Sequence, residues 1–196
     1  AQLVIRVHPG ELKTHGTSMV EVIEQAFPAL PEHIHLVRPE DKTNTYDLVE
    51  TADFGIVYTT TVGLEMAMSG LPVAVTGLTH YAEKGFTLDP ADWQDFESIL
   101  FRLAADPASM RLSQQQVEQA WLYAYLFFFE FSLPFPWHLL WLHEDFEARP
   151  MRFVLSPEGQ KRYAQTFGYL AGEPLDWAAR GLARLPSLSE KEETHQ

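Results

Sequence analysis

One stretch of the chain, residues 53–75, limits the possible folds more than any other. It opens with the apolar run 54–58, which is typical of a strand buried in a parallel sheet. Three threonines and a short helical segment follow, and Gly70 and Pro72 end that segment. The apolar residues 73–75 form the next predicted strand. This order of strand, helix and strand predicts a parallel crossover unit.

Thr59, Thr60 and Thr61 stand where the helix of this unit is expected to begin. The N-terminus of a helix carries unpaired N–H groups and partial positive charge, so it suits a phosphate group. Glu65 follows about one helical turn later, within reach of the hydroxyl pair of a ribose. The alternative is that a threonine only caps the helix, as threonine commonly does. Both interpretations are open from this stretch alone.

The rest of the first 76 residues repeats the alternation of strands and helices. Such alternation implies right-handed crossovers, and hence a Rossmann-like, doubly wound parallel sheet in an α/β domain. Thr17 or Ser18 is expected to cap the first helix, with Glu21 completing a capping box, and Thr45 is expected to cap the second helix. The strands are predicted at residues 2–7, 34–37, 54–58 and 73–75, and the first two helices at residues 18–27 and 45–49.

Polar residues gather in the loops that follow these strands. The four loops span residues 8–11, 38–45, 59–63 and 76–85. Ligands of doubly wound sheets bind beyond the carboxyl ends of the strands, so we expect the loops to meet at one edge. His8 opens the first loop, and His80, Tyr81 and Lys84 lie in the fourth. Lys84 could neutralise phosphate charge and Tyr81 could stack on a ring. The alternative is an ordinary solvated loop.

From Asp92 onward the pattern changes from alternating strands to helices. Apolar residues recur at helical spacing over residues 93–105, so a helix is expected there. Further helices are expected at residues 112–131, 156–170 and 175–185. We therefore expect residues 1–105 to form the Rossmann-like domain, residues 106–186 an aromatic-rich α-helical C-terminal region, and residues 187–196 a charged tail.

The segment 120–142 carries ten aromatic residues and has the length of a membrane-crossing helix. Its prolines Pro134 and Pro136 and its charged Glu130 argue against such a helix, because proline breaks helices and a charge is costly in lipid. A buried protein interface is the favoured interpretation, and a contact with the membrane surface is the alternative. The residues expected to pack on a partner are Trp121, Phe128, Trp137 and Trp141.

The net charge of −13 argues against a nucleic-acid-binding surface, which should be basic. The chain has no cysteine, which excludes disulfides, cysteine-based zinc sites and thiol nucleophiles, and which fits a reducing compartment. Residues 2–7 are too short for the apolar core of a signal peptide. These features favour a cytoplasmic location. The first residue is Ala, which is consistent with a piece excised from a longer protein.

Four motifs resemble the donor-binding C-terminal domain of GT-B glycosyltransferases. They are His8-Pro9, Tyr46-Asp47-Leu48 with Ala52-Asp53, TTVGLEMA at residues 60–67, and Gly70-Leu71-Pro72-Val73. More narrowly, the chain is similar to bacterial capsule polysaccharide biosynthesis proteins, whose relatives include Kdo transferases. Gly77, Tyr81 and Gly85-Phe86-Thr87 fit that narrower group. The resemblance covers residues 4–90, and the helix motif also occurs in nucleotide-sugar 2-epimerases of the same fold.

The resemblance implies a role for each matching residue. The residues that would bind the donor nucleotide and its phosphate are His8, Thr59, Thr60, Thr61, Gly63 and Glu65. Among them, Thr60 and Thr61 would hold the phosphate and Glu65 would accept hydrogen bonds from the ribose. The residues that would face the donor sugar or phosphate are His80, Tyr81 and Lys84. The fold works without a bound metal, and no Asp-x-Asp pair is present, so neither a metal nor a cofactor is expected.

The expected reaction is transfer of a sugar from a nucleotide-activated donor to a bacterial capsular polysaccharide. The general base would come from an N-terminal acceptor domain, which this chain does not contain, or from a partner subunit. The chain alone would therefore bind the donor weakly and turn over poorly. Its expected location is the cytoplasm or the inner face of the membrane. Two alternatives are a nucleotide-sugar 2-epimerase-like enzyme and a non-catalytic assembly module of a polysaccharide synthesis or export complex.

Overall fold

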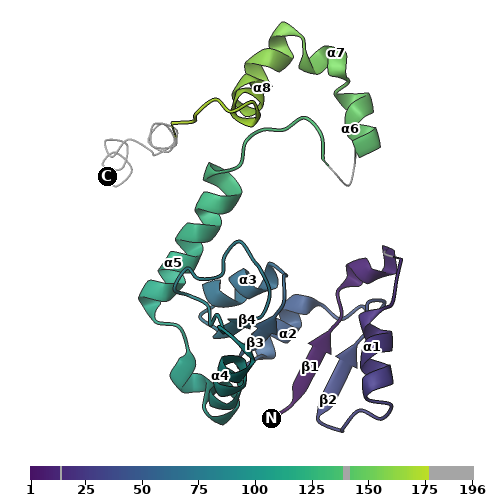
Figure 1. Cartoon of the computed structure of the whole chain (residues 1–196), viewed down its shortest axis with the longest axis vertical. Coiled ribbons are helices and arrows are strands. Elements are labelled where there is room, and N and C mark those ends of the chain that lie inside the picture. The colour runs from purple at the N-terminus through teal and green to yellow at the C-terminus, as the bar shows by residue number, and fades with distance from the viewer. Residues whose placement is uncertain (14, 139–141, 177–196) are drawn as a thin grey trace, which may run out of the picture. The chain divides into compact units, whose positions relative to one another are not determined.

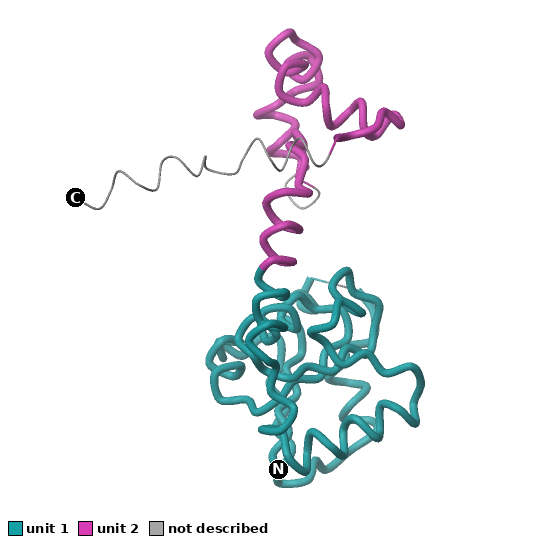
Figure 2. Tube along the Cα trace, turned by 90° about the vertical axis from the view of Figure 1, so that its left-hand side faces the viewer, with its two compact units in different colours: residues 1–121 teal, residues 122–196 magenta. Residues whose placement is uncertain are grey.

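The computed structural model describes residues 1–13, 15–138 and 142–176. Its contacts divide the chain into two compact units, residues 1–121 (unit 1) and residues 122–196 (unit 2), which Figure 2 colours separately. Unit 1 is mixed α/β, and the described part of unit 2 is helical. None of the helices in the described ranges has both the length and the apolarity that crossing a membrane requires.

The strands lie where the sequence predicts them, but they form two sheets. In the described residues they are β1 (Leu3–Arg6), β2 (Ile34–Val37), β3 (Gly55–Val57) and β4 (Val73–Val75). β1 pairs in parallel with β2, and β3 with β4, and Figure 1 shows the two pairs as separate ribbons. Two small parallel sheets thus stand in place of the single doubly wound sheet that was expected. In the described residues each strand pairs with one other strand, and Leu88 adds an isolated parallel bridge to Ala74 of β4.

The helices predicted in unit 1 are present. They are α1 (Met19–Ala26), α2 (Thr45–Thr51), α3 (Val62–Met68), α4 (Trp93–Ala105) and the first part of α5 (Gln114–Tyr125), with the 3₁₀ turns η1 (Pro9–Lys13) and η2 (Pro107–Met110). Ser18 caps α1 in the predicted capping box with Glu21. Asn44, rather than the predicted Thr45, caps α2, because its side-chain oxygen accepts the Tyr46 N–H at 3.1 Å.

The core of unit 1 lies around β3, β4, α3 and α4. All three residues of β4 are buried, as expected for a strand that is covered on both faces. Leu64 of α3 is buried, and Leu103 of α4 packs with Ala74 of β4. The β1–β2 sheet is less covered, since Leu3 and Val4 are 42% and 45% exposed. The loops after β3 and β4 therefore leave from the best-packed part of the unit.

Hydrogen bonds extend unit 1 beyond residue 105, where the sequence places the domain boundary. The Leu112 N–H donates to the Gly70 carbonyl at 3.1 Å. The indole N–H of Trp121 donates to the Met68 carbonyl at 3.0 Å. η2 and the start of α5 therefore belong to the α/β unit.

Unit 2 has short helices and a small core. After α5 come the π-helix η3 (Leu126–Glu130), α6 (Leu142–Ala148), α7 (Met151–Val154) and α8 (Pro157–Leu170). Val154 of α7 and Tyr163 of α8 are buried where these helices pack together. The Trp137 ring stacks on Phe146, with ring centroids 4.6 Å apart, so it packs inside unit 2. Trp141, the end of the helix predicted at residues 175–185 and the tail 187–196 lie outside the described residues.

Candidate functional site

One hydrogen bond joins the loop after β4 to the threonine turn after β3. The Tyr81 O–H group donates to the Thr60 carbonyl oxygen at 2.5 Å. The Tyr81 side chain is fully buried, and burial raises the pKa of Tyr81, so the phenol stays protonated and able to donate. The turn and the loop therefore hold each other at the carboxyl ends of β3 and β4.

Gly63 allows α3 to approach this buried tyrosine. A Cβ atom on Gly63 would lie 2.4 Å from the Tyr81 hydroxyl oxygen and 2.8 Å from Cγ2 of Val57. Both distances are shorter than real Cβ contacts, so any larger residue would push α3 away. Gly63 was expected to bind the nucleotide. In the structure it makes room for packing between α3, β3 and the Tyr81 loop.

The three threonines of the turn differ in what their side chains do. The Thr60 hydroxyl accepts the Val62 N–H at 3.3 Å, so it caps the first turn of α3. Thr61 is the N-cap residue, but its side chain makes no capping hydrogen bond. Thr59 and Thr61 are exposed. The capping role therefore belongs to Thr60, and two exposed hydroxyl-bearing residues flank it where a phosphate is expected.

Glu65 on α3 interacts with Tyr46 in the first turn of α2. The negative charge of Glu65, followed by its hydrogen bond, raises the pKa of Tyr46. Tyr46 is 59% exposed and Glu65 is half-buried, so the pair lies at the surface. A ribose that hydrogen-bonded to Glu65 would share the carboxylate with this phenol or displace it.

His80 and Lys84 are both exposed in the loop after β4. The His80 ring meets the Tyr81 ring edge-on, with ring centroids 5.3 Å apart. His80 is exposed as a residue, but partial burial of its imidazole lowers the pKa of His80, which favours the neutral ring near pH 7. Lys84 is therefore the residue of this loop that can offer positive charge to a phosphate.

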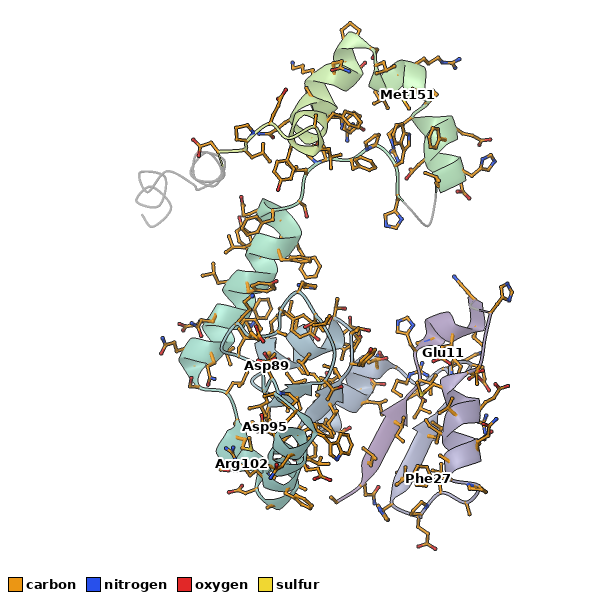
Figure 3. All side chains as sticks on the ribbon, viewed as in Figure 1. Glu11, Phe27, Asp89, Asp95, Arg102 and Met151 are labelled. Carbon is orange, nitrogen blue, oxygen red and sulfur yellow. The ribbon has the colours of Figure 1, made fainter. Side chains whose placement is uncertain are left out.

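Asp89, labelled in Figure 3, fixes the far side of the same loop. Its carboxylate accepts the Thr87 hydroxyl at 2.8 Å and the Glu83 N–H at 3.0 Å. Glu83 has a φ of 59°, in the left-handed region that few residues other than glycine adopt. Gln116 of α5 donates to the Gly85 carbonyl at 2.9 Å. Sequence reasoning missed Asp89 and Gln116, because their contacts with Glu83 and Gly85 join residues that are not neighbours in the sequence.

His8 follows β1 and is held within its own loop. Its Nδ1 accepts the Gly10 N–H at 2.9 Å, and its carbonyl oxygen accepts the Glu11 N–H at 3.0 Å. An accepting Nδ1 places the proton of the neutral ring on Nε2. Both hydrogen bonds join His8 to residues of its own loop, and neither reaches the threonine turn.

The predicted site residues thus fall into two sets. The first set gathers around the Tyr81 side chain. Thr60, Gly63 and His80 contact Tyr81, and Thr59 and Thr61 are the sequence neighbours of Thr60. The other set contains His8 in the first loop, Glu65 beside Tyr46, and the exposed Lys84. The partnership of Glu65 with Tyr46 had not been predicted, although both residues belong to the motifs quoted for the resemblance.

Two further features bear on where a ligand could bind. Within the described ranges, no group of three or more His, Asp or Glu side chains is placed to hold a metal ion. A pocket of about 520 Å³ lies in unit 2 and contains none of the predicted site residues. It is lined by Phe131, Leu133, Phe135, Thr166, Tyr169 and Leu170.

Comparison with known protein families, curated proteins and solved structures found no match for the chain.

Proposed function

We propose that unit 1 binds the nucleotide-sugar donor of a GT-B type glycosyltransferase, which transfers the sugar to a bacterial capsular polysaccharide. The observation that carries the proposal is the hydrogen bond from Tyr81 to the Thr60 carbonyl. It ties two loops together at the carboxyl ends of two parallel strands, where ligands bind in open α/β sheets. The resemblance of residues 4–90 to such donor-binding domains points to the same edge.

In this proposal the donor phosphate lies beside the start of α3. The hydroxyls of Thr59 and Thr61 and the N–H groups of the first turn donate to its oxygens, and Lys84 supplies positive charge. When the bond between sugar and phosphate breaks, negative charge grows on the departing nucleotide, and these donors stabilise it. Tyr81 is a positioning residue, because its buried ring has no face to offer a sugar.

Glu65 has the chemistry to recognise the ribose of the donor. A carboxylate accepts hydrogen bonds from both hydroxyls of a ribose, and Glu65 lies on α3 one turn after the threonines. Its partner Tyr46 holds the carboxylate at the surface until the ribose arrives. The general base for the acceptor belongs to an N-terminal acceptor domain or a partner subunit, so this chain alone binds donor and turns over slowly.

We also propose that the two sheets are halves of one doubly wound sheet with the strand order β2-β1-β3-β4. In the described residues β1 and β3 each pair along one edge, so a β1–β3 pairing would leave both existing pairs unchanged. Ligands of such sheets bind where the strand order reverses, which here is between β1 and β3. His8 follows β1 and Thr59 follows β3, so this pairing would bring His8 to the threonine turn.

Calorimetric titration with CMP-linked and UDP-linked sugars tests the donor site. We expect one of these donors to bind, and Glu65→Ala to weaken binding about 10-fold to 100-fold, because a charged acceptor is lost. Lys84→Ala should also weaken binding. Glu97→Ala is the matched control, since Glu97 is an exposed carboxylate on α4, which carries none of the predicted site residues. Absence of binding, or equal affinity in Glu65→Ala, Lys84→Ala and Glu97→Ala, would contradict the proposal.

Two alternatives give different results. An epimerase converts the free nucleotide sugar without any acceptor, whereas a transferase needs a glycan, so product analysis without acceptor separates them. An assembly module without catalysis shows no nucleotide affinity. The exposed aromatic side chains of unit 2 favour the assembly module as the second candidate.

A further inference from the structure

The loop after β4 leaves the sheet and returns to it. The Thr76 N–H donates to the Val57 carbonyl at 2.9 Å where the loop begins. Leu88 forms the isolated parallel bridge with Ala74 where the loop comes back. Residues 76–88 are therefore a closed loop whose two ends are fixed on the β3–β4 sheet.

Two hydrogen bonds hold the backbone on both sides of Lys84. The Glu83 N–H donates to the Asp89 carboxylate at 3.0 Å, and the Gly85 carbonyl accepts the side-chain amide of Gln116 at 2.9 Å. Glu83 and Gly85 have φ values of 59° and 89°, so Lys84 lies between two residues in the left-handed region. A residue other than glycine stays in that region only when its surroundings hold it there. The position of Lys84 therefore depends on Asp89 in the loop and on Gln116 in α5.

Gln116 is itself fixed at the start of α5. Its side-chain oxygen accepts the Ser113 N–H at 3.0 Å, and the Ser113 hydroxyl accepts the Gln116 N–H at 3.4 Å, which is the pattern of a capping box. Because the oxygen faces the Ser113 N–H, the NH₂ group is the end that faces the Gly85 carbonyl. The amide of Gln116 thus links the first turn of α5 to the loop.

The same part of the chain also contacts the end of α3. The Leu112 N–H, just before α5, donates to the Gly70 carbonyl at 3.1 Å, and the Trp121 indole donates to the Met68 carbonyl at 3.0 Å. All of these contacts lie within unit 1. Since α3 begins at the threonine turn, residues 112–121 hold both parts of the proposed donor site.

We propose that Gln116 is a positioning residue of the donor site, which fixes Lys84 where its charge reaches the donor phosphate. This inference rests on the proposed function. A cation that is already held where its ligand needs it loses less freedom on binding than a cation on a loose loop. Gln116 acts through Lys84, and it does not touch the donor.

Gln116→Glu tests the proposal most sharply. A carboxylate keeps the acceptor that the Ser113 N–H needs, but it cannot donate to the Gly85 carbonyl. Without donor, we expect faster backbone hydrogen exchange in residues 82–87, because the loop is held less firmly. Calorimetry with CMP-linked and UDP-linked sugars should show donor binding weakened about threefold to tenfold, because the loop loses one hydrogen bond.

Gln115→Glu is the matched control. Gln115 is the exposed neighbour of Gln116 on α5, and the variant receives the same negative charge. It should change neither the exchange of residues 82–87 nor the affinity for the donor. Circular dichroism checks that both variants keep their helices.

The same two variants in a Lys84→Ala background separate positioning from a general loss of stability. If Gln116 acts through Lys84, Gln116→Glu has no further effect on donor affinity once Lys84 is removed. A general loss of stability would weaken binding equally with and without Lys84.

The outcomes distinguish this inference from the proposed function. If neither sugar nucleotide bound the unchanged chain, the proposed function would be contradicted, and the role of Gln116 in donor binding would fall with it. If the donor bound but Gln116→Glu left its affinity unchanged, or weakened it equally with and without Lys84, only the positioning role would be overturned. Unchanged exchange of residues 82–87 in Gln116→Glu would overturn that role as well.

Discussion

Tyr81 and Gly63 act together at the centre of the proposed site. The Tyr81 hydroxyl reaches the Thr60 carbonyl only because Gly63 leaves room beneath it. The contact between Tyr81 and Gly63, together with the hydrogen bond to Thr60, fixes the threonine turn and the loop that carries Lys84. In the proposed site, donor binding therefore depends on a residue that does not touch the donor.

Replacing Tyr81 with Phe removes the hydroxyl that the Thr60 carbonyl accepts. We expect the free energy of unfolding to fall by about 1–3 kcal/mol, because a buried polar group loses its partner. Gly63→Ala should cost a similar ~1–3 kcal/mol through overpacking. Urea denaturation measures both changes. Tyr58→Phe is the control, since that side chain is 71% exposed, and its effect should stay within ~0.5 kcal/mol. Equal effects for Tyr81→Phe and Tyr58→Phe would contradict this packing.

Sequence reasoning singled out Tyr81 but did not predict how its side chain packs. It placed Tyr81 against a ligand ring, whereas the side chain is buried. Whether a loop residue is buried depends on how the loop folds back over α3. The spacing of apolar residues along the chain does not predict that fold. The pairing of Glu65 with Tyr46 is hidden for the same reason, because α2 and α3 meet only in space.

At the scale of elements, local chemistry decides most boundaries. Ser18 accepts the Val20 N–H at 3.1 Å, and Glu21 closes the capping box at the start of α1. These are contacts between near neighbours, so the sequence predicts them. The cap of α2 is Asn44 and not the expected Thr45. The two residues are neighbours and both types cap helices well, so the sequence does not distinguish them.

Ser18→Ala should lower the free energy of unfolding by about 1 kcal/mol, because an N–H at the start of α1 loses its acceptor. Thr17→Ala is the matched control, since Thr17 is exposed and lies outside the cap. Thermal or urea unfolding of both variants gives the comparison. Donor affinity should be unchanged in both variants. If Thr17→Ala lowered the free energy of unfolding as much as Ser18→Ala does, the assignment of Ser18 as the N-cap of α1 would be contradicted.

Sheet pairing was predicted less completely than the strands themselves. The apolar runs identify four strands, and parallel pairs between neighbouring strands follow from the helices that connect them. Whether β1 also pairs with β3 depends on contacts between segments about 50 residues apart, which the local pattern does not encode. The sequence therefore predicted the strands and their parallel direction, and the joining of the two pairs into one sheet remains a proposal.

At the scale of the whole molecule, the chain combines an α/β unit with a helical unit. The division after Trp121 was not predictable, because α5 continues through it without a change of pattern. It is set by contacts such as the hydrogen bond from Trp121 to the Met68 carbonyl, which joins residues far apart in the sequence. The motifs that carry the resemblance end at residue 90, so none of them lies in unit 2.

Backbone hydrogen exchange of the whole chain, with and without the nucleotide sugar that binds, tests the central claim most directly. We predict slower exchange of amides in residues 59–63 and 76–85, where the Tyr81 hydrogen bond holds the two loops together. α4 should exchange at the same rate in both samples, since it carries none of the proposed donor-binding residues. Protection confined to the lining of the unit 2 pocket, or the same exchange with and without donor at residues 59–63 and 76–85, would contradict the account.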